Sequence, residues 1–229
     1  MQDHIELTNR NDRTITVRGT GRLQVKPDLT VINLNLITKN KDYSAAMEEA
    51  SKLQDALRKT LEELGFKKDA LTTSSFNVNT EYESVRNREG GYHQVFAGYV
   101  CYHSMRLEFP FDPKKLSEVL SAISDCIADP ELNVQFTVKD KEPLVEQLLR
   151  NAAENALSRA KLLAECTGVE LKELITVDYS FANREFVSPT NFVGGVKQMM
   201  RGGANAVEMD IEAQNIDVSE SVTFVWRIG

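Results

Sequence analysis

The sequence predicts an α+β protein whose central part has the ferredoxin-like β-α-β-β-α-β order, and three observations predict it. Segments that alternate polar and apolar residues, typical of strands, are separated by segments in which apolar residues recur every three or four positions, as on one helix face. Between residues 29 and 139 these segments follow the split βαβ order. A third long helix and two further strands come afterwards, so helices covering a mostly antiparallel sheet are expected.

Two strands are expected before the first helix. Residues 14–18 alternate polar and apolar side chains, and Gly19-Thr20-Gly21 is expected to break or bulge this strand, which can resume at residues 23–25. Pro27-Asp28 marks a turn. The second strand covers residues 29–38, where the apolar positions alternate with polar ones and include Ile32, Leu34 and Leu36.

The clearest helix covers residues 44–64, because one apolar stripe runs along it and Gly65 is a typical helix-ending residue. The next strand carries Phe76, Val78, Thr80 and Tyr82 on one face. A polar hairpin loop over residues 83–94 leads into a long strand over residues 95–109. The apolar face of that strand is expected to hold Val95, Ala97, Tyr99, Cys101, His103, Met105, Leu107 and Phe109.

The remainder of the chain is expected to contain two helices and three strands. Asp112 followed by Pro113 is a typical helix start and begins a second amphipathic helix. The next strand carries Leu132, Val134, Phe136 and Val138 on one face. A long helix begins near Pro143 and ends at Gly168, with an inward face of Val145, Leu148, Leu149, Ala152, Ala156, Ala160 and Leu163. Alternation predicts the last two strands, with apolar positions at residues 175–181 and 216–228.

Residues 184–215 form a long segment without a sustained period, inside a single predicted domain of residues 14–229 that follows a flexible tail of residues 1–13. Long loops of this kind are usually functional or disordered. Methionine and phenylalanine are frequent at adaptable binding surfaces, which favours a candidate interface here. The equal alternative is a loop that folds back over its own sheet. The candidate interface residues are Phe186, Phe192, Val193, Val196, Met199 and Met200.

The composition argues against several classes of protein. A net charge of −7 and the lack of a basic run argue against general binding to nucleic acids or anionic membranes. Three cysteines without a CxxC spacing argue against a disulfide framework or a zinc knuckle. No stretch approaches the ~20 apolar residues of a membrane helix. The polar N-terminal residues show no signal peptide, so we expect a cytoplasmic location, or a periplasmic one if a leader was removed.

Residues able to carry chemistry are scattered along the sequence. Cys101 and His103 lie two positions apart on one expected strand, but no third metal ligand lies nearby, so a packed thiol and a hydrogen-bonded histidine are the better interpretation. The other histidines, His4 and His93, fall in the tail and in a loop. Gly19-Thr20-Gly21 lacks the third glycine of a dinucleotide loop. We therefore expect no catalytic, metal-binding or cofactor-binding residues and no enzyme activity.

Several blocks of sequence, taken in their order and spacing, resemble one known family. They are Val17-Arg18-Gly19-Thr20-Gly21 with Pro27-Asp28, Leu64-Gly65-Phe66 with Leu71-Thr72-Thr73, Phe136-Thr137-Val138-Lys139-Asp140, the alanine-containing helix before Thr167-Gly168-Val169, and the terminal strand of residues 219–228. The sequence thus resembles the SIMPL domain family, also called DUF541, over residues 14–228. It departs from the family in having no leader and in carrying Ala213-Gln214-Asn215 where members often have a Pro-Gly turn.

The resemblance implies an α+β fold, assembly as a homo-oligomer, a link to bacterial periplasmic proteins of oxidative-stress defence, and no established catalytic residues. We therefore expect a non-catalytic, self-assembling protein with a role in stress defence or the cell envelope. Two alternatives stay open. One is a small-molecule or metal-dependent enzyme whose site is assembled from distant residues, and the other is an adaptor that binds other proteins.

Overall fold

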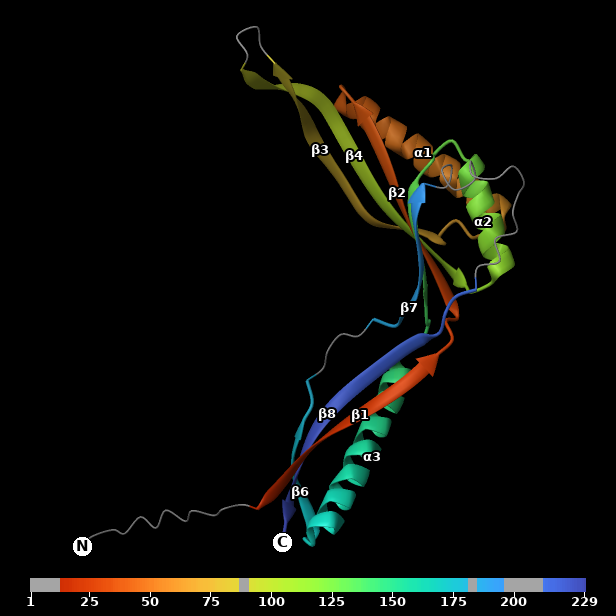
Figure 1. The fold of residues 1–229 in the computed structure, drawn as a ribbon. Coiled ribbons are helices and arrows are strands. Elements are labelled where there is room, and N and C mark those ends of the chain that lie inside the picture. The colour runs from red at the N-terminus through yellow and green to blue at the C-terminus, as the bar shows by residue number, and fades with distance from the viewer. Residues whose placement is uncertain (1–12, 87–90, 181–184, 196–211) are drawn as a thin grey trace, which may run out of the picture. The chain divides into compact units, whose positions relative to one another are not determined.

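The computed structural model describes residues 13–86, 91–180, 185–195 and 212–229, and this part of the chain contains three helices and eight strands in two sheets (Figure 1). The predicted α+β class is confirmed. Within the predicted domain, the chain divides into two compact units. Unit 1 comprises Met1–Val25, Asp140–Phe186 and Asp217–Gly229, and unit 2 comprises Lys26–Lys139 and Val187–Ile216. Residues 1–12 of the expected tail lie outside the described residues.

Unit 2 contains a five-stranded sheet with the strand order β3-β4-β2-β5-β7. Its first four strands reproduce the predicted ferredoxin-like arrangement, in which strands joined by a helix are not neighbours. All neighbouring strands are antiparallel. The strands are β2 (Leu29–Asn40), β3 (Leu71–Arg86), β4 (Tyr92–Pro110), β5 (Glu131–Thr137) and β7 (Val187–Gly195). Strand β7 pairs with β5 inside the segment of residues 184–215, for which no regular element was predicted.

Two helices, α1 (Tyr43–Glu63) and α2 (Pro113–Asp125), cover one face of the sheet in unit 2 (Figure 1). The apolar side chains that alternate along β2 and those that form the predicted stripe of α1 pack together in this core. Burial of one large apolar side chain contributes roughly 1.5–3 kcal/mol, so this core makes a large favourable contribution to the stability of unit 2. Its fully buried side chains include Ile32, Leu34, Leu57, Met105, Leu107, Leu116, Leu120 and Ile123.

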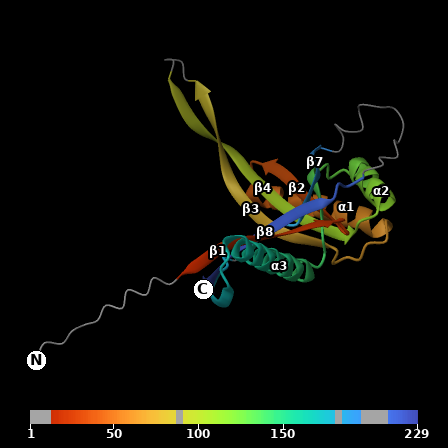
Figure 2. The same ribbon diagram turned by 60° about the horizontal axis from the view of Figure 1, so that its bottom comes forward.

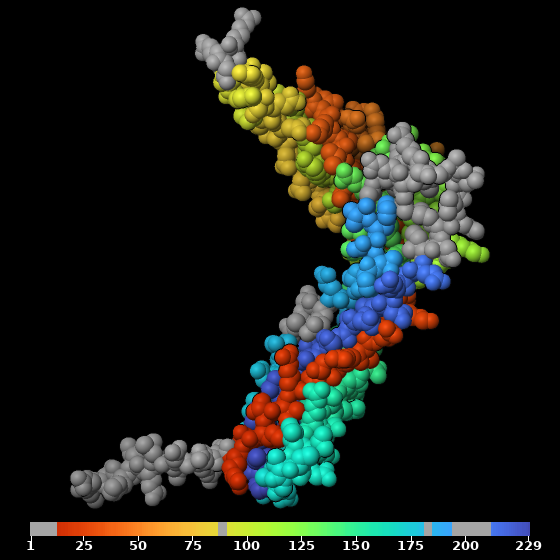
Figure 3. All heavy atoms as spheres, viewed as in Figure 1, coloured from red at the N-terminus to blue at the C-terminus, as the bar shows by residue number. Residues whose placement is uncertain are grey.

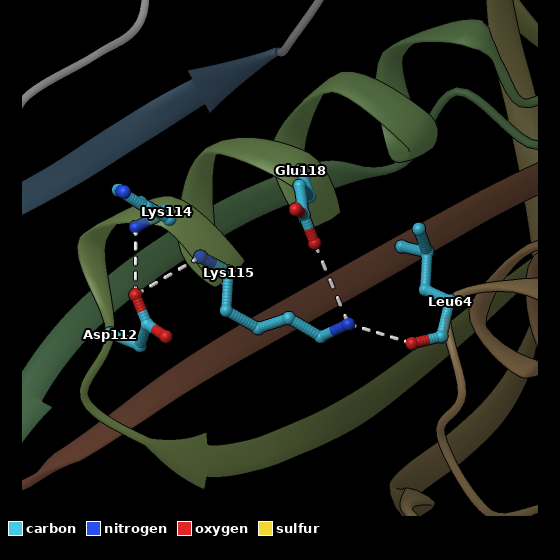
Figure 4. A network of polar contacts seen from close by, with 5 residues as sticks. All are labelled: Leu64, Asp112, Lys114, Lys115 and Glu118. Carbon is cyan, nitrogen blue, oxygen red and sulfur yellow. Dashed lines mark hydrogen bonds and ion pairs between the residues drawn. The ribbon is translucent and has the colours of Figure 1, made fainter.

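The first turn of α2 also contacts the end of α1 (Figure 4). Asp112 is the predicted N-cap, because its Oδ1 accepts hydrogen bonds from the backbone N–H groups of Lys114 (2.9 Å) and Lys115 (3.3 Å). The Nζ of Lys115 donates to the carbonyl oxygen of Leu64 at 2.6 Å and lies 3.6 Å from Glu118. One lysine of α2 therefore satisfies a carbonyl that helix α1 leaves unpaired at its C-terminus.

Unit 1 contains a three-stranded sheet with the order β1-β8-β6 and one long helix, α3 (Glu142–Thr167), that packs against it (Figure 2). The strands are β1 (Thr14–Val25), β6 (Leu171–Asp178) and β8 (Ile216–Ile228). Helix α3 presents a buried stripe at four-residue spacing, which consists of Leu148, Ala152, Ala156, Ala160 and Ala164. Leu163, which was predicted to face inward, is 46% exposed because it lies beside this stripe.

Strand β1 runs without interruption through Gly19 and Gly21, where a break or bulge was expected. Both glycines are buried and face α3. A Cβ atom on Gly19 would overlap the carbonyl oxygen of Ala152, and one on Gly21 would overlap that of Leu148. The expected break is therefore absent from this strand, and the two glycines allow the helix backbone to approach the strand closely. In Figure 3 the atoms of β1 (red) and α3 (green to cyan) are in direct contact.

None of the helices in the described part of the chain is both long and apolar enough to cross a membrane.

Candidate functional site: the β3–β4 hairpin

The longest paired strands of the structure, β3 and β4, form an antiparallel hairpin that runs from the pair Leu71–Leu107 to the pair Arg86–Tyr92. A β-bulge interrupts the ladder, because Glu81 pairs with Gly98 and the next pair is Tyr82–Phe96. Gly98 has φ = +150°, and a Cβ atom there would lie 2.7 Å from the carbonyl oxygen of Asn40. Only glycine fits this close approach.

The bulge changes which side chains of β4 share a face. The sequence placed Val95, Ala97 and Tyr99 on the apolar face of a strand with unbroken alternation. Beyond Gly98 the alternation shifts by one residue, so Phe96 joins Tyr99 on the face that α1 covers in part. The expected apolar face is therefore confirmed for Cys101, His103, Met105, Leu107 and Phe109, which are buried, and wrong for Val95 and Ala97.

Four aromatic rings form a continuous row where the hairpin extends past the start of α1. This aromatic row consists of Tyr43, Tyr99, Phe96 and Tyr82. Successive ring centroids are 5.5, 5.3 and 6.0 Å apart, and the ring planes are inclined by 71° to 83°. Edge-to-face pairs of this kind contribute about 0.5–1.5 kcal/mol each. Tyr43, Phe96 and Tyr82 are nevertheless 50%, 44% and 56% exposed, so a large apolar surface faces outward.

The outer edge of β3 is a second exposed feature of the hairpin, and its atoms (ochre to yellow) form a margin of unit 2 in Figure 3. Pairing with β4 is regular from Ser75 to Glu81, between the shift at Thr73 and the bulge after Glu81. We call residues 75–81 the open edge. Apart from β4, no element of the described part of the chain makes extensive contact with β3. The backbone groups that point away from β4 are therefore available to another strand.

Charge on the open edge is low. Its one ionisable side chain, Glu81, accepts two hydrogen bonds from the Nζ of Lys39 at 2.6 and 2.9 Å. Both side chains are solvent-accessible, so the pair contributes little to stability. The ion pair instead neutralises the open edge, because the carboxylate charge on β3 is balanced by a cation on β2.

His103 lies on the buried face of β4, as predicted, and is 5% exposed. Its Nε2 shares a hydrogen bond of 2.9 Å with the hydroxyl of Thr73, and its ring packs edge-on against Phe76. Its Nδ1 has no hydrogen-bond partner among the described residues. Burial lowers the pKa of the His103 imidazole below its ordinary value, and the guanidinium of Arg58 lowers this pKa further. A lower pKa favours the neutral ring, and the contacts with Thr73 and Phe76 hold this ring in the core.

The other residues considered for chemistry are the three cysteines and two further histidines. Cys101 and Cys126 are buried and Cys166 is exposed, and all three are free thiols. Within the described residues, no group of three or more His, Cys, Asp or Glu side chains is positioned to hold a metal ion. His93 is exposed on β4, and His4 lies outside the described residues.

The candidate interface of the long segment is divided between the core and the surface. Phe186 is 1% exposed, and Phe192 packs against the core of unit 2. Val193 is 71% exposed on β7. Val196, Met199 and Met200 lie outside the described residues. A contact role for this segment stays a prediction that rests, in the described part of the chain, on Val193.

The aromatic row was missed because its members come from a helix start and from two strands with a bulge between them. Tyr82 and Tyr99 were assigned to faces of separate strands, and Phe96 to the opposite face. A single glycine inside a strand pattern often marks a bulge. Gly98 was therefore the signal that could have placed Phe96 beside Tyr99.

Comparison with known proteins agrees with the resemblance seen in the sequence. The family described as "SIMPL: Protein of unknown function (DUF541)" matches residues 15–226. A "26 kDa periplasmic immunogenic protein" of Brucella melitensis biotype 1 is 23% identical over 170 residues, which are 71% of this chain and 65% of that protein. The protein of the same name from Brucella abortus strain S19 is 22% identical over the same shares. The match thus spans less than two thirds of these relatives. Because the family match extends over nearly the entire sequence, this chain belongs to the SIMPL family.

Proposed function

We propose that this chain is a non-catalytic SIMPL-domain protein that works by self-association through the β3–β4 hairpin. The observation that carries the proposal is the aromatic row, in which Tyr99 contacts both Tyr43 and Phe96, and Phe96 contacts Tyr82. Tyr43, Phe96 and Tyr82 nevertheless remain about half exposed. Aromatic side chains that are rigidly placed and accessible are enriched at the centres of protein interfaces. The dispersed thiols and the buried, neutral His103 favour a contact function over catalysis.

The cell envelope is the favoured place of action. Both curated relatives are called periplasmic in their names, and they are similar to this chain over 170 residues. A role in oxidative-stress defence, which the family resemblance implies, stays a prediction.

Light scattering on the purified protein over a range of concentrations tests self-association. We expect a mass above that of the 25.7 kDa chain. Replacing Phe96 and Tyr82 by serine should weaken association at least tenfold, about 1.4 kcal/mol. Ile127→Ser is the matched control, because Ile127 is 76% exposed in unit 2 but lies away from the hairpin. A strict monomer at high concentration would contradict the proposal. If Ile127→Ser weakened association as much as the double variant does, the aromatic row would not be the contact surface.

A further inference from the structure

We infer that two copies of this chain pair through the open edge of β3, in an antiparallel arrangement that joins their two five-stranded sheets into one. This inference rests on the proposed self-association and specifies its partner, a second copy, and its geometry. It is argued from a comparison of the sheet edges, from the regular length of the open edge, and from the charges that the pairing would bring together.

The outer edge of β1 is blocked by side chains of α3. Three polar residues of the helix recur at four-residue spacing, which places them over alternate residues of the strand. They occupy backbone groups that would otherwise be free to bind another strand. The contacts are the Thr20 N–H to Asn155 Oδ1 (3.1 Å), Asn151 Nδ2 to the Arg22 carbonyl (3.2 Å) and Arg159 Nη1 to the Arg18 carbonyl (3.1 Å).

The outer edge of β7 is blocked in a different way. Pro189 lacks an N–H group, and such residues are confined to sheet edges that do not pair further. The carbonyl of Gln214 accepts a hydrogen bond from the Ser188 hydroxyl (2.7 Å), and the N–H of Gln214 donates to the Thr190 hydroxyl (3.0 Å). The chain before β8 therefore occupies part of this edge.

Strand β6 is an irregular edge. Its pairing with β8 shifts twice, between Leu171 and Leu174 and between Leu174 and Thr176. It also carries charges, of which Glu173 forms an ion pair with Arg227 at 2.8 Å. Bulges and charged side chains are two devices that prevent edge-to-edge pairing.

The open edge of β3 carries none of these devices within the described residues. Its sequence, Ser-Phe-Asn-Val-Asn-Thr-Glu, contains no proline and no lysine, and its pairing with β4 is regular throughout. Its length is that of a typical strand. Its single charge is balanced by Lys39. A regular, nearly neutral edge of this length is a template for an added strand.

A second copy fits this edge in one register. When a two-fold axis passes through Val78, every residue of the open edge pairs with one of its copy, and any other register leaves some of them unpaired. Asn77 then lies opposite Asn79 of the other copy, and Glu81 lies opposite Ser75. No like charges face each other, and facing amide side chains can form hydrogen bonds.

Site-specific disulfide formation tests this register. Asn77→Cys and Asn79→Cys are prepared as separate chains, each with Cys166→Ser because Cys166 is the exposed native thiol. Residues directly opposite in an antiparallel pair have Cα atoms about 4.5–5.5 Å apart, within the disulfide range. Co-expressed chains should give a linked dimer on mild oxidation, at least fivefold more than either chain alone. The inference would be overturned if one variant alone gave as much linked dimer as the co-expressed chains. It would also be overturned if the protein assembled but no linked dimer formed.

The introduction of charged side chains at Asn77 and Asn79 gives a second test that does not depend on oxidation. Asn77→Lys with Asn79→Lys places lysine opposite lysine twice across the two-fold axis and should weaken association at least tenfold. Asn77→Lys with Asn79→Asp is self-complementary in this register and should retain association. Equal urea midpoints would show that both variants fold. If the wild-type chain is monomeric, the proposed function fails as well; if it assembles and both double variants assemble equally well, only this inference fails.

Discussion

Gly19 of β1 lies so close to Ala152 of α3 that a Cβ atom on Gly19 would overlap the Ala152 carbonyl oxygen and lie 2.7 Å from the Cβ of Ala156. The neighbouring contacts are with helix backbone, which cannot rotate away as a long side chain could. The close packing of unit 1 therefore depends on the absence of a side chain at this position.

The first prediction is that Gly19→Ala destabilises unit 1 by roughly 1–3 kcal/mol, the range for overpacking a well-packed core. Trp226 is the single tryptophan of the chain and is buried in unit 1, so its fluorescence during urea unfolding reports on this unit. Arg18→Ala, at an exposed position of the same strand, is the control and should shift the midpoint little. A wild-type midpoint for Gly19→Ala would show that α3 can move away without cost.

The second prediction concerns the polar side chains of α3 that occupy the edge of β1. Asn155→Ala leaves the Thr20 N–H without its acceptor, which costs about 1–3 kcal/mol, and the better helix propensity of alanine offsets about 0.5 kcal/mol. The net loss should appear in Trp226 fluorescence. Asn151→Ala with Asn155→Ala should also raise light scattering on heating, because β1 then has a free edge. Glu154→Ala on the exposed side of α3 should do neither.

The elements that were predicted correctly from the sequence are those in which one continuous segment carries the whole pattern of apolar residues. Residues 29–38 and 44–64 were predicted as a strand and a helix, and β2 and α1 have nearly these bounds. Their apolar residues meet in a single core, so the local pattern and the tertiary environment agree. The ferredoxin-like order followed from the sequence of such elements.

The elements that were missed depend on contacts between distant segments. Strand β7 contains Pro189 and two glycines and has little strand propensity of its own, but its ladder with β5 stabilises it. For Phe186 and Phe192 the sequence left a contact surface and a loop folded over its own sheet as equal alternatives, because no period surrounded them. Both residues lie against cores. Unit 1 assembles from the beginning, middle and end of the chain, so no composition shift marks its boundary.

The third prediction concerns the contact between α2 and the end of α1. Lys115→Met keeps the aliphatic chain near Phe66 but removes the ammonium that binds the Leu64 carbonyl. The loss should be about 1.5–3 kcal/mol, the range for a hydrogen bond to a charged group. Far-UV circular dichroism in urea measures it. Lys114→Met is the control, since the hydrogen bond of Lys114 to Asp112 comes from its backbone. Glu118→Gln should change little, because this carboxylate is well exposed.

The last prediction is that His103 makes the stability of unit 2 depend on pH. Burial and Arg58 lower its pKa in the folded chain, whereas in the unfolded chain the pKa is about 6.5. Between these two values the unfolded chain binds more protons, so stability is fully present above about pH 6.5 and falls as the pH falls toward the folded pKa. Urea midpoints for wild type and His103→Asn at about pH 7.5 and pH 5 test this, with wild type expected to lose more on acidification. His93→Gln, at an exposed position, should follow wild type at both pH values. Parallel losses in wild type and His103→Asn would mean that the imidazole is protonated as readily in the folded chain as in water.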